Sequence, residues 1–390
     1  MKIAFLTPEF PHAKTGNSGG IGTSILNLAT GLIKLGHEAI ILVYGQKEDD
    51  VFHENGIDFY RIKNVKFKGI SRFLTQKKIE KLINALVLEN KIDLVEAPDW
   101  TGFTSFIQPK CPIVIRLNGS DTYFCHLDNR PVKWHNRFHE KRALQKANGL
   151  ISVSQFTAIV TNKVFGFDKK FTIIPNGINT ETFEKNSFSN EYSNHSILYF
   201  GTLIRKKGLL ELPLIFNEIV KKDKNVTLIL VGKDASDRIS GNSSTWQMMQ
   251  NIFTPEALLQ VHFKGSVPYD AIKTIINEAA VCVFPSFAEA LPVSWIEAMA
   301  MQKAIVASDI GWASEVIDEG KNGFLVNPKN HIEYADKIVT LLQNSQLQQK
   351  FGIAARMKAK NRFSIEVVAK SSVDFYQITL DNFIKSKNIL

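Results

Sequence analysis

The feature that most constrains the fold of this chain is the alternation of short apolar segments with longer, helix-like patterns. Short continuous apolar runs are typical of strands buried on both faces. Strands that alternate with helices indicate parallel sheets with helices on both sides. We predict helices such as Thr23–Leu35 and Thr75–Glu89. We predict strands at Lys2–Thr7, Ala39–Tyr44, Phe59–Ile62, Ile92–Glu96, Ile113–Leu117, Gly149–Val153, Thr172–Ile174, Ile197–Phe200, Val226–Val231, Val261–Phe263, Val281–Phe284, Ala304–Ala307 and Phe324–Val326.

A polar stretch at 184–194 interrupts this alternation and has the composition of a linker. The pattern then restarts, and the 390 residues have room for two or three domains. We therefore predict an α/β protein with two Rossmann-like, doubly wound domains facing each other across a cleft. We predict that the first domain spans 1–185 and the second 186–365, and that 366–390 forms a helix. Ligands of such domains bind at the carboxyl ends of the strands.

Composition excludes several other classes. Hydrophobic residues make up 44% of the chain and charged residues 22%, as in soluble globular proteins. No run approaches the roughly 18 apolar residues of a membrane-spanning helix. Pro8 breaks the first apolar segment before a secretory signal develops. The three cysteines form no C-x-x-C pair, which argues against a disulfide framework or a cysteine-ligated zinc site. We expect a cytoplasmic protein.

Much of the net charge of +9 lies between Arg61 and Lys81, where basic and apolar residues are interleaved and Glu80 is the single acid. Such a segment can rest on an anionic membrane surface, which would place the protein peripherally on the inner face of the membrane. The alternative is a solvated face beside a helix. Nucleic acid is not expected, because no binding motif accompanies the charge. The basic residues are Arg61, Lys63, Lys66, Lys68, Arg72, Lys77, Lys78 and Lys81.

Two loops have the character of anion-binding sites. The first predicted strand leads into the glycine-bearing loop 16–22, which includes Gly19 and Gly20 and precedes a helix. Glycines let the backbone approach a ligand, and amides at a helix N-terminus favour phosphate. The second loop, 200–208, brings Arg205, Lys206 and Lys207 to the start of a helix, where cations oppose the helix dipole. A bound anion would relieve that conflict. Each loop alone is a weak signal, and the alternative is a structural turn at the first loop and an exposed basic turn at the second.

The strongest constellation follows the strand that ends at Phe284. A short loop presents Glu289, Pro292 suits the first turn of a helix, and Glu297 lies eight positions after Glu289. Backbone amides near Val293 and Ser294 are expected at the same mouth of the sheet. Two carboxylates and these amides suit a ligand with both hydroxyls and phosphate. The alternative is that Glu289 caps the helix and Glu297 is a surface acid.

These motifs, in this order, resemble the glycosyltransferase family 4 group, retaining enzymes of the GT-B fold. Glu289 and Glu297 match the family's E-x7-E signature, and 298–308 matches what usually follows it. Gly19-Gly20 matches the N-terminal glycine loop, 175–178 the segment between the domains, and Lys207-Gly208 the phosphate-binding turn. Gly311, Glu315 and 322–326 are similar to the last conserved segment of the family's C-terminal domain.

The resemblance implies a function and roles for the residues. It implies transfer of a hexose from a nucleotide-diphosphate sugar to a glycan or lipid-linked acceptor, in cell-surface polysaccharide biosynthesis. Glu289 would hold donor-sugar hydroxyls and Glu297 the ribose, with Leu291 and Val293 beside them. Lys207 and Arg205 would neutralise the leaving diphosphate, which the Gly19 and Gly20 amides would also contact. The N-terminal domain would be on the acceptor side, with the last helix packing back toward it.

No cofactor and no metal are expected, since the chain has no D-x-D motif. The family's site is rich in groups that stabilise a leaving group, and such electrostatic stabilisation is a large part of catalysis.

Three positions depart from the family pattern. The usual His-Gly is Asn118-Gly119 here, and an amide cannot take up a proton near neutral pH. Asn118 could still orient the sugar, and His126, His135 or His139 could replace the imidazole. The usual arginine after the glycine of the second-domain turn is Thr202, whose missing charge Arg205 could supply. A familiar glycine is Pro292.

Three other functions stay open. One is a non-catalytic subunit that binds nucleotide sugars, which the loss of the imidazole at Asn118 would fit. The others are a nucleotide-sugar epimerase and a glycan phosphorylase of the same fold. Glu289 and Glu297 beside Lys207 favour transfer. A Rossmann dehydrogenase is disfavoured, because no G-x-G-x-x-G fingerprint is present.

Overall fold

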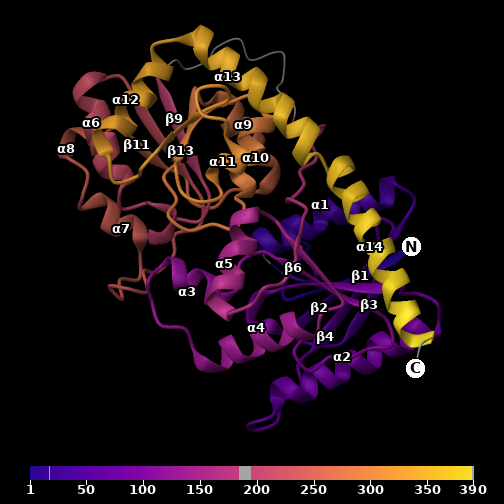
Figure 1. Ribbon diagram of the computed structural model, residues 1–390. Helices are drawn as coiled ribbons and strands as arrows, with labels where there is room; N and C mark the ends of the chain where they lie inside the picture. Colours follow the sequence, from indigo (N-terminus) through magenta and orange to yellow (C-terminus); the bar gives the residue numbers. More distant parts are fainter. Residues whose placement is uncertain (17, 184–194, 389–390) are drawn as a thin grey trace. The chain divides into compact units, whose positions relative to one another are not determined.

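The computed structural model describes residues 1–16, 18–183 and 195–388. The predicted linker at 184–194 lies outside the described residues, as does Asn17 of the glycine loop. The chain forms two compact units, the first of 1–178 together with the chain from 363 onward, the second of 179–362 (Figure 1). Within the described ranges, none of the helices has the length and apolar character needed to cross a bilayer.

The first unit is built on an eight-stranded sheet. Side chains of β1 alternate between two apolar clusters, Ala4 and Leu6 facing one and Ile3 and Phe5 the other, so the strand is buried on both faces. The strands, in spatial order, are β3 (Asp50–Glu54), β4 (Ile57–Lys63), β2 (Glu38–Gln46), β1 (Lys2–Thr7), β5 (Leu94–Pro98), β6 (Ile113–Leu117), β7 (Gly149–Ser152) and β8 (Thr172–Ile173).

Helices connect these strands, and the last helix of the chain also belongs to this unit. That helix packs closely on α1: a Cβ on Gly31 would lie 2.7 Å from the Ile365 carbonyl oxygen, so only glycine permits this approach. The helices are α1 (Gly20–Lys34), α2 (Ser71–Leu88), the short 3-10 turn η1 (Trp100–Gly102), α3 (Asp121–Leu127), α4 (Trp134–Lys146), α5 (Gln155–Phe165) and α14 (Ile365–Asn388).

The second unit has a six-stranded sheet whose strand pairs are all parallel. Its strands, in spatial order, are β11 (Val261–Phe263), β10 (Thr227–Val231), β9 (Ser196–Phe200), β12 (Val281–Phe284), β13 (Ala304–Ser308) and β14 (Phe324–Val326). Its helices are η2 (Arg205–Lys207), α6 (Leu212–Lys222), α7 (Thr245–Gln250), α8 (Pro255–Leu258), α9 (Tyr269–Glu278), α10 (Val293–Ala300), α11 (Ala313–Val316), α12 (His331–Leu342), α13 (Ser345–Lys358) and the π turn η3 (Ala359–Phe363).

The predicted class, two Rossmann-like domains with parallel sheets, is confirmed. One strand departs from it, because β3 pairs with β4 antiparallel at the edge of the first sheet. In each sheet the strand order changes direction beside the first strand of the unit. That point lies between β1 and β5 in one sheet and between β9 and β12 in the other. Open α/β sheets bind ligands at such switch points.

Candidate active site

In the second unit, the turn after β9 and the loop after β12 meet at the switch point. The Phe287 amide donates to the Lys206 carbonyl oxygen at 2.8 Å. Gly208 has a φ of +73°, and a Cβ on it would lie 1.8 Å from the Pro285 carbonyl oxygen. Glycine at this position therefore allows the basic turn to lie directly against the loop that carries Glu289.

This contact brings Lys207 and Glu289 together. The Lys207 ammonium lies 3.1 Å from a carboxylate oxygen of Glu289, and both side chains are largely buried. A lysine ammonium has three hydrogen-bond donors, so it can bind an anion while keeping the bond to Glu289. The pair places a cation and a carboxylate at one point.

Arg205 does not share this partner. Its guanidinium makes a two-bond contact with Asp237, at 2.9 Å from Nε and 2.7 Å from Nη2. This hydrogen bond from Arg205 holds the pKa of Asp237 well below its usual range. The three cations do not begin a long helix as expected, because they form the three-residue turn η2 and α6 begins only at Leu212. The charge of Arg205 is balanced by Asp237 rather than left for an anionic ligand. The sequence reasoning missed Asp237.

The helix after Glu289 differs in detail from the expectation. Pro292 precedes α10 as its N-cap residue, so Val293 rather than Pro292 opens the first turn. Glu297 lies in the second turn of α10 and is only 6% exposed, which contradicts the alternative of a surface acid. Leu291 is also buried.

In the first unit, the glycine loop leads into α1, with Gly19 as N-cap and Gly20 as first residue. Glu9, just beyond β1, accepts a hydrogen bond from the Gly22 amide at 3.1 Å. A carboxylate at a helix N-terminus is favoured by the helix dipole. The start of α1 thus already binds one anionic group of the chain itself, next to the Gly19 and Gly20 amides predicted to contact phosphate.

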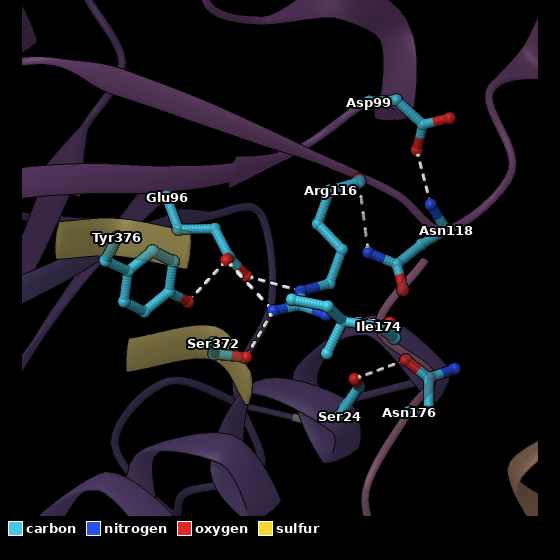
Figure 2. Close-up of polar contacts among 9 residues, drawn as sticks. All are labelled: Ser24, Glu96, Asp99, Arg116, Asn118, Ile174, Asn176, Ser372 and Tyr376. Carbon is cyan, nitrogen blue, oxygen red and sulfur yellow. Dashed lines mark hydrogen bonds and ion pairs between the residues drawn. The ribbon is translucent and has the colours of Figure 1, made fainter. Parts of the chain in front are cut away.

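Asn118 follows β6 in a turn that is fixed from both sides. Gly119 has a φ of +92°, and Ser120 caps α3 by accepting a hydrogen bond from the Tyr123 amide. On the other side, the backbone amide of Asn118 donates to Asp99 Oδ1 at 2.9 Å (Figure 2). Asn118 also lines a narrow pocket of about 10 Å³ together with Ser24, Glu96 and Arg116.

Asp99 is a second residue that the sequence reasoning missed. It is 2% exposed, and its Oδ2 has no hydrogen-bond partner among the residues that the structure describes. Burial, with a smaller contribution from Glu140, raises the pKa of Asp99 to about 7. A signal existed in the sequence, because Asp99 closely follows a predicted strand, where a doubly wound sheet places ligand-binding groups.

The Asn118 side chain donates to the Arg116 carbonyl oxygen at 3.4 Å. The Arg116 guanidinium belongs to a buried polar network and donates to both oxygens of Glu96 at 2.8 and 3.2 Å. Arg116 also donates to Ser372 and to the Ile174 carbonyl oxygen, and Tyr376 donates to Glu96 (Figure 2). The network therefore joins two neighbouring strands to α14 and to the segment that ends the first unit. Nearby, Ser24 of α1 donates to the Asn176 side chain at 2.8 Å.

The three histidines proposed as substitutes for the family imidazole lie in or beside α3 and α4. His126 and His135 are exposed, whereas His139 is packed beside Ser105, 2.7 Å from its hydroxyl. Burial and the nearby cation Arg72 lower the pKa of His139 to about 4, so it is neutral at physiological pH. In the groups of ligating side chains that the described residues form, we find no cluster suited to a metal.

Two Rossmann-like units, each built on a largely parallel sheet, are the architecture of the GT-B fold. Two family profiles match consecutive parts of the chain, Glycosyltransferase Family 4 over 18–182 and Glycosyl transferases group 1 over 180–358. The chain belongs to this glycosyltransferase family.

Known proteins with similar sequences or structures agree with this assignment. The uncharacterized glycosyltransferase MJ1607 of Methanocaldococcus jannaschii is 25% identical, over 98% of this chain and 99% of its own length. The capsular polysaccharide biosynthesis glycosyltransferase CapM of Staphylococcus aureus is 26% identical, over 62% of this chain and 64% of its own. The structure of Anabaena Alr3699/HepE in complex with UDP and glucose has a TM-score of 0.73 and 20% identity, over 96% and 98% of the two chains.

Proposed function

We propose that this glycosyltransferase moves a hexose from a nucleotide-diphosphate sugar to a glycan or lipid-linked acceptor in cell-surface polysaccharide biosynthesis, with retention at the anomeric carbon. The observation that carries the proposal is the Lys207–Glu289 contact at the switch point of the second sheet. The similarity to CapM supports a polysaccharide pathway, and the UDP and glucose bound by HepE support a nucleotide-sugar donor.

In this mechanism, Glu289 accepts hydrogen bonds from donor-sugar hydroxyls, and Glu297 binds the ribose. Lys207 stabilises the negative charge that develops on the diphosphate as the glycosidic bond breaks. Arg205 assists with the donors that Asp237 leaves unused. Leu291 and Val293 border the donor, and Gly19 and Gly20 contact its phosphates. Asn118, oriented by Asp99, positions the sugar without exchanging a proton.

The departing phosphate oxygen would accept the proton of the acceptor hydroxyl on the same face of the sugar. Positive charge from Lys207 takes the place that a metal holds in metal-dependent transferases. We therefore expect no metal or other cofactor in the reaction, and full activity in excess chelator. Complete loss of activity that added metal restores would contradict this mechanism.

A panel of nucleotide sugars tests the function directly, with donor turnover and product anomer followed by NMR. Turnover with retention supports the proposal. Binding without turnover would indicate a non-catalytic subunit, and a changed sugar epimer without transfer an epimerase.

Lys207→Ala tests the donor site. A hydrogen bond to a charged group contributes about 1.5–3 kcal/mol, so nucleotide diphosphate affinity should fall roughly ten- to a hundredfold. Lys233→Ala is the control, a lysine just after the neighbouring strand β10. Unchanged affinity in Lys207→Ala would remove this residue from the site.

The basic segment 61–81 was expected to bring the protein to an anionic membrane, and its structure shows that part of its charge is neutralised. Arg61 lies 3.2 Å from both Glu48 and Asp50, and Lys78 is 2.6 Å from Asp49. Counting residues within the segment overstated its free charge, because these acids precede it in the sequence. Peripheral attachment to the inner face of the membrane stays part of our proposal.

A further inference from the structure

Several exposed apolar side chains of the first unit lie on α4 and on or just before the start of α2. Trp134 opens α4 and is 79% exposed, and Phe138 follows one turn later at 48%. Phe67 is 61% exposed, Ile70 48% and Phe73 42%. We call this set of five residues, Phe67, Ile70, Phe73, Trp134 and Phe138, the α2–α4 face.

Phe106 joins the two halves of this face. Its ring centroid lies 5.6 Å from that of Phe73 on α2 and 6.4 Å from that of Phe138 on α4. The loop that carries Phe106 is fixed to both helices. Arg72 of α2 donates to the Thr101 carbonyl oxygen, and Arg142 of α4 donates to that of Ser105 at 2.9 Å. Phe73, Phe106 and Phe138 therefore form one aromatic cluster that bridges α2 and α4.

The surroundings of this face are cationic. Lys66, Lys68 and Lys133 are exposed, and none of them is ion-paired with an acid among the residues described. Arg137 is also exposed, with its guanidinium 5.5 Å from the Phe165 ring.

The acidic residues of α2 and α4 already have hydrogen-bond partners away from this face. Glu140, the only acid of α4, is fully buried and accepts hydrogen bonds from the Asp121 and Thr122 amides at the start of α3. On α2, Glu80 accepts from Lys77 and from the Gln108 amide. No carboxylate of α2 or α4 is therefore available to balance the exposed lysines.

We propose that the α2–α4 face docks on an anionic lipid bilayer, with the aromatic side chains in the interface and the cations on the headgroups. Aromatic and basic residues interleaved in this way suit a surface that is apolar beneath an anionic layer. A second copy of the same face is disfavoured, because it would bring like charges together. The proposal extends attachment beyond 61–81 to α4, and it rests on the proposed function for the purpose of that attachment, access to a lipid-linked acceptor.

Flotation with vesicles tests the face directly. We compare vesicles of phosphatidylcholine with vesicles of phosphatidylcholine and phosphatidylglycerol in equal parts, at 0.05 M and 0.5 M salt. Wild-type protein should float with the anionic vesicles at low salt and lose most of its binding at high salt, since the screening length shortens severalfold. No binding at low salt, or equal binding to both vesicle types, would overturn the proposal.

Two double variants separate the face from general hydrophobicity. Trp134→Ser with Phe138→Ser should reduce partitioning at least about tenfold, because two interfacial aromatic anchors are lost. Leu88→Ser with Ile159→Ser is the matched control. These residues are 70% and 56% exposed, and Leu88 lies at the far end of α2, about 22 Å along the helix from Phe73. Equal loss in both variants would contradict the assigned face.

Charge is tested by Lys66→Gln and Lys68→Gln, each of which should lower affinity for anionic vesicles by roughly fivefold. Light scattering of the free protein tests whether a second copy of the chain binds this face instead of a membrane. A dimer that Trp134→Ser with Phe138→Ser abolishes, in a protein that binds no vesicles, would assign the face to a second copy and overturn the proposal. Donor binding by calorimetry should be equal in all variants, so failure of docking is distinguishable from failure of the proposed transferase activity.

Discussion

At the scale of single residues, Glu289 has the most direct chemical role in the function that we propose. Its carboxylate is held by Lys207 at the carboxyl end of two neighbouring strands, where a bound sugar would replace water as its hydrogen-bond partner. We expect Glu289→Gln to fold normally and to lose at least roughly a hundredfold in transfer rate, about 2.7 kcal/mol, because contacts to hydroxyls are strongest in the transition state. Initial rates with the matched donor measure the effect.

The control for this substitution is Glu256→Gln, an exposed acid in the first turn of α8 that should leave the rate unchanged. A near-normal rate in Glu289→Gln would refute the assignment. Thermal unfolding of both variants separates a lost contact from a lost fold.

Asp99 is the residue at which stability should depend on pH. Its pKa is raised from the ordinary value of 3.8 to about 7, chiefly by burial. The folded protein therefore binds a proton that the unfolded chain releases between about pH 4 and 7. The free energy of unfolding should fall as pH rises through this interval and level off above it. Glu140, with a pKa raised to about 7 by burial, acts in the same direction.

Asp99→Asn isolates the contribution of this one carboxyl, because an amide oxygen can still accept the Asn118 hydrogen bond. We expect the variant to be more stable than wild type at pH 8, by a few kcal/mol at most, and this advantage to be clearly smaller at pH 5. Denaturant unfolding at the two pH values measures the difference. A difference that does not change with pH would show that Asp99 is ionised in the folded protein.

These residues also show the limits of sequence reasoning about the site. Lys207 and Glu289 were predicted from their places at the ends of strands, and the structure brings them together. Asp237 was missed because nothing local connects it to Arg205, which lies 32 residues earlier. Asp99 was missed although its position followed the same rule as Asn118.

At the scale of elements, the contact between η2 and the loop after β12 depends on one glycine. Gly208 combines a φ of +73° with a Cβ position 1.8 Å from the Pro285 carbonyl oxygen, whereas Gly241 has a φ of +75° and open space. Gly241→Ala should cost about 1–2 kcal/mol from backbone strain alone. Gly208→Ala should cost clearly more and weaken donor binding, because the Lys207 turn must move away from the Glu289 loop. Denaturant unfolding and donor calorimetry measure both effects, and equal costs would contradict this account.

Strands were predicted well where burial on both faces makes them continuously apolar, as in β6, whose predicted and observed bounds coincide. The antiparallel β3 was not predicted. Its sequence, DVFHE, mixes charged and apolar residues, and all five residues are partly or fully exposed at the sheet edge. Phe52 of β3 stacks on Phe59 of β4 at 4.7 Å. Pairing at a polar edge is decided by such cross-strand contacts, which no single segment reveals.

At the scale of the whole molecule, the end of the chain completes the first unit. A helix after Phe363 was predictable from sequence, but its packing partners were implied only by resemblance to the family. Ser372 and Tyr376 of α14 reach partners 256 and 280 residues earlier, Arg116 and Glu96. The Arg116 and Glu96 side chains are each 4% exposed and lie 2.8 Å apart, so they form a buried ion pair.

This pair allows a test of how the unit is held together. Arg116→Met leaves the Glu96 carboxylate buried without its cation and should cost about 3–5 kcal/mol. Adding Glu96→Gln removes the uncompensated charge, and the amide can still accept the Tyr376 hydroxyl, so the double variant should be more stable than Arg116→Met alone. Tyr376→Phe alone should cost about 1.5–3 kcal/mol, because it removes a hydrogen bond to a charged group.

Amide hydrogen exchange shows in which part of the chain each of these variants loses stability. Faster exchange should extend over 1–178 and α14 but leave 195–362 unchanged, since the network lies wholly within the first unit. Equal loss of protection in both units, or a double variant less stable than the single one, would show that α14 is not joined to the sheet through this ion pair.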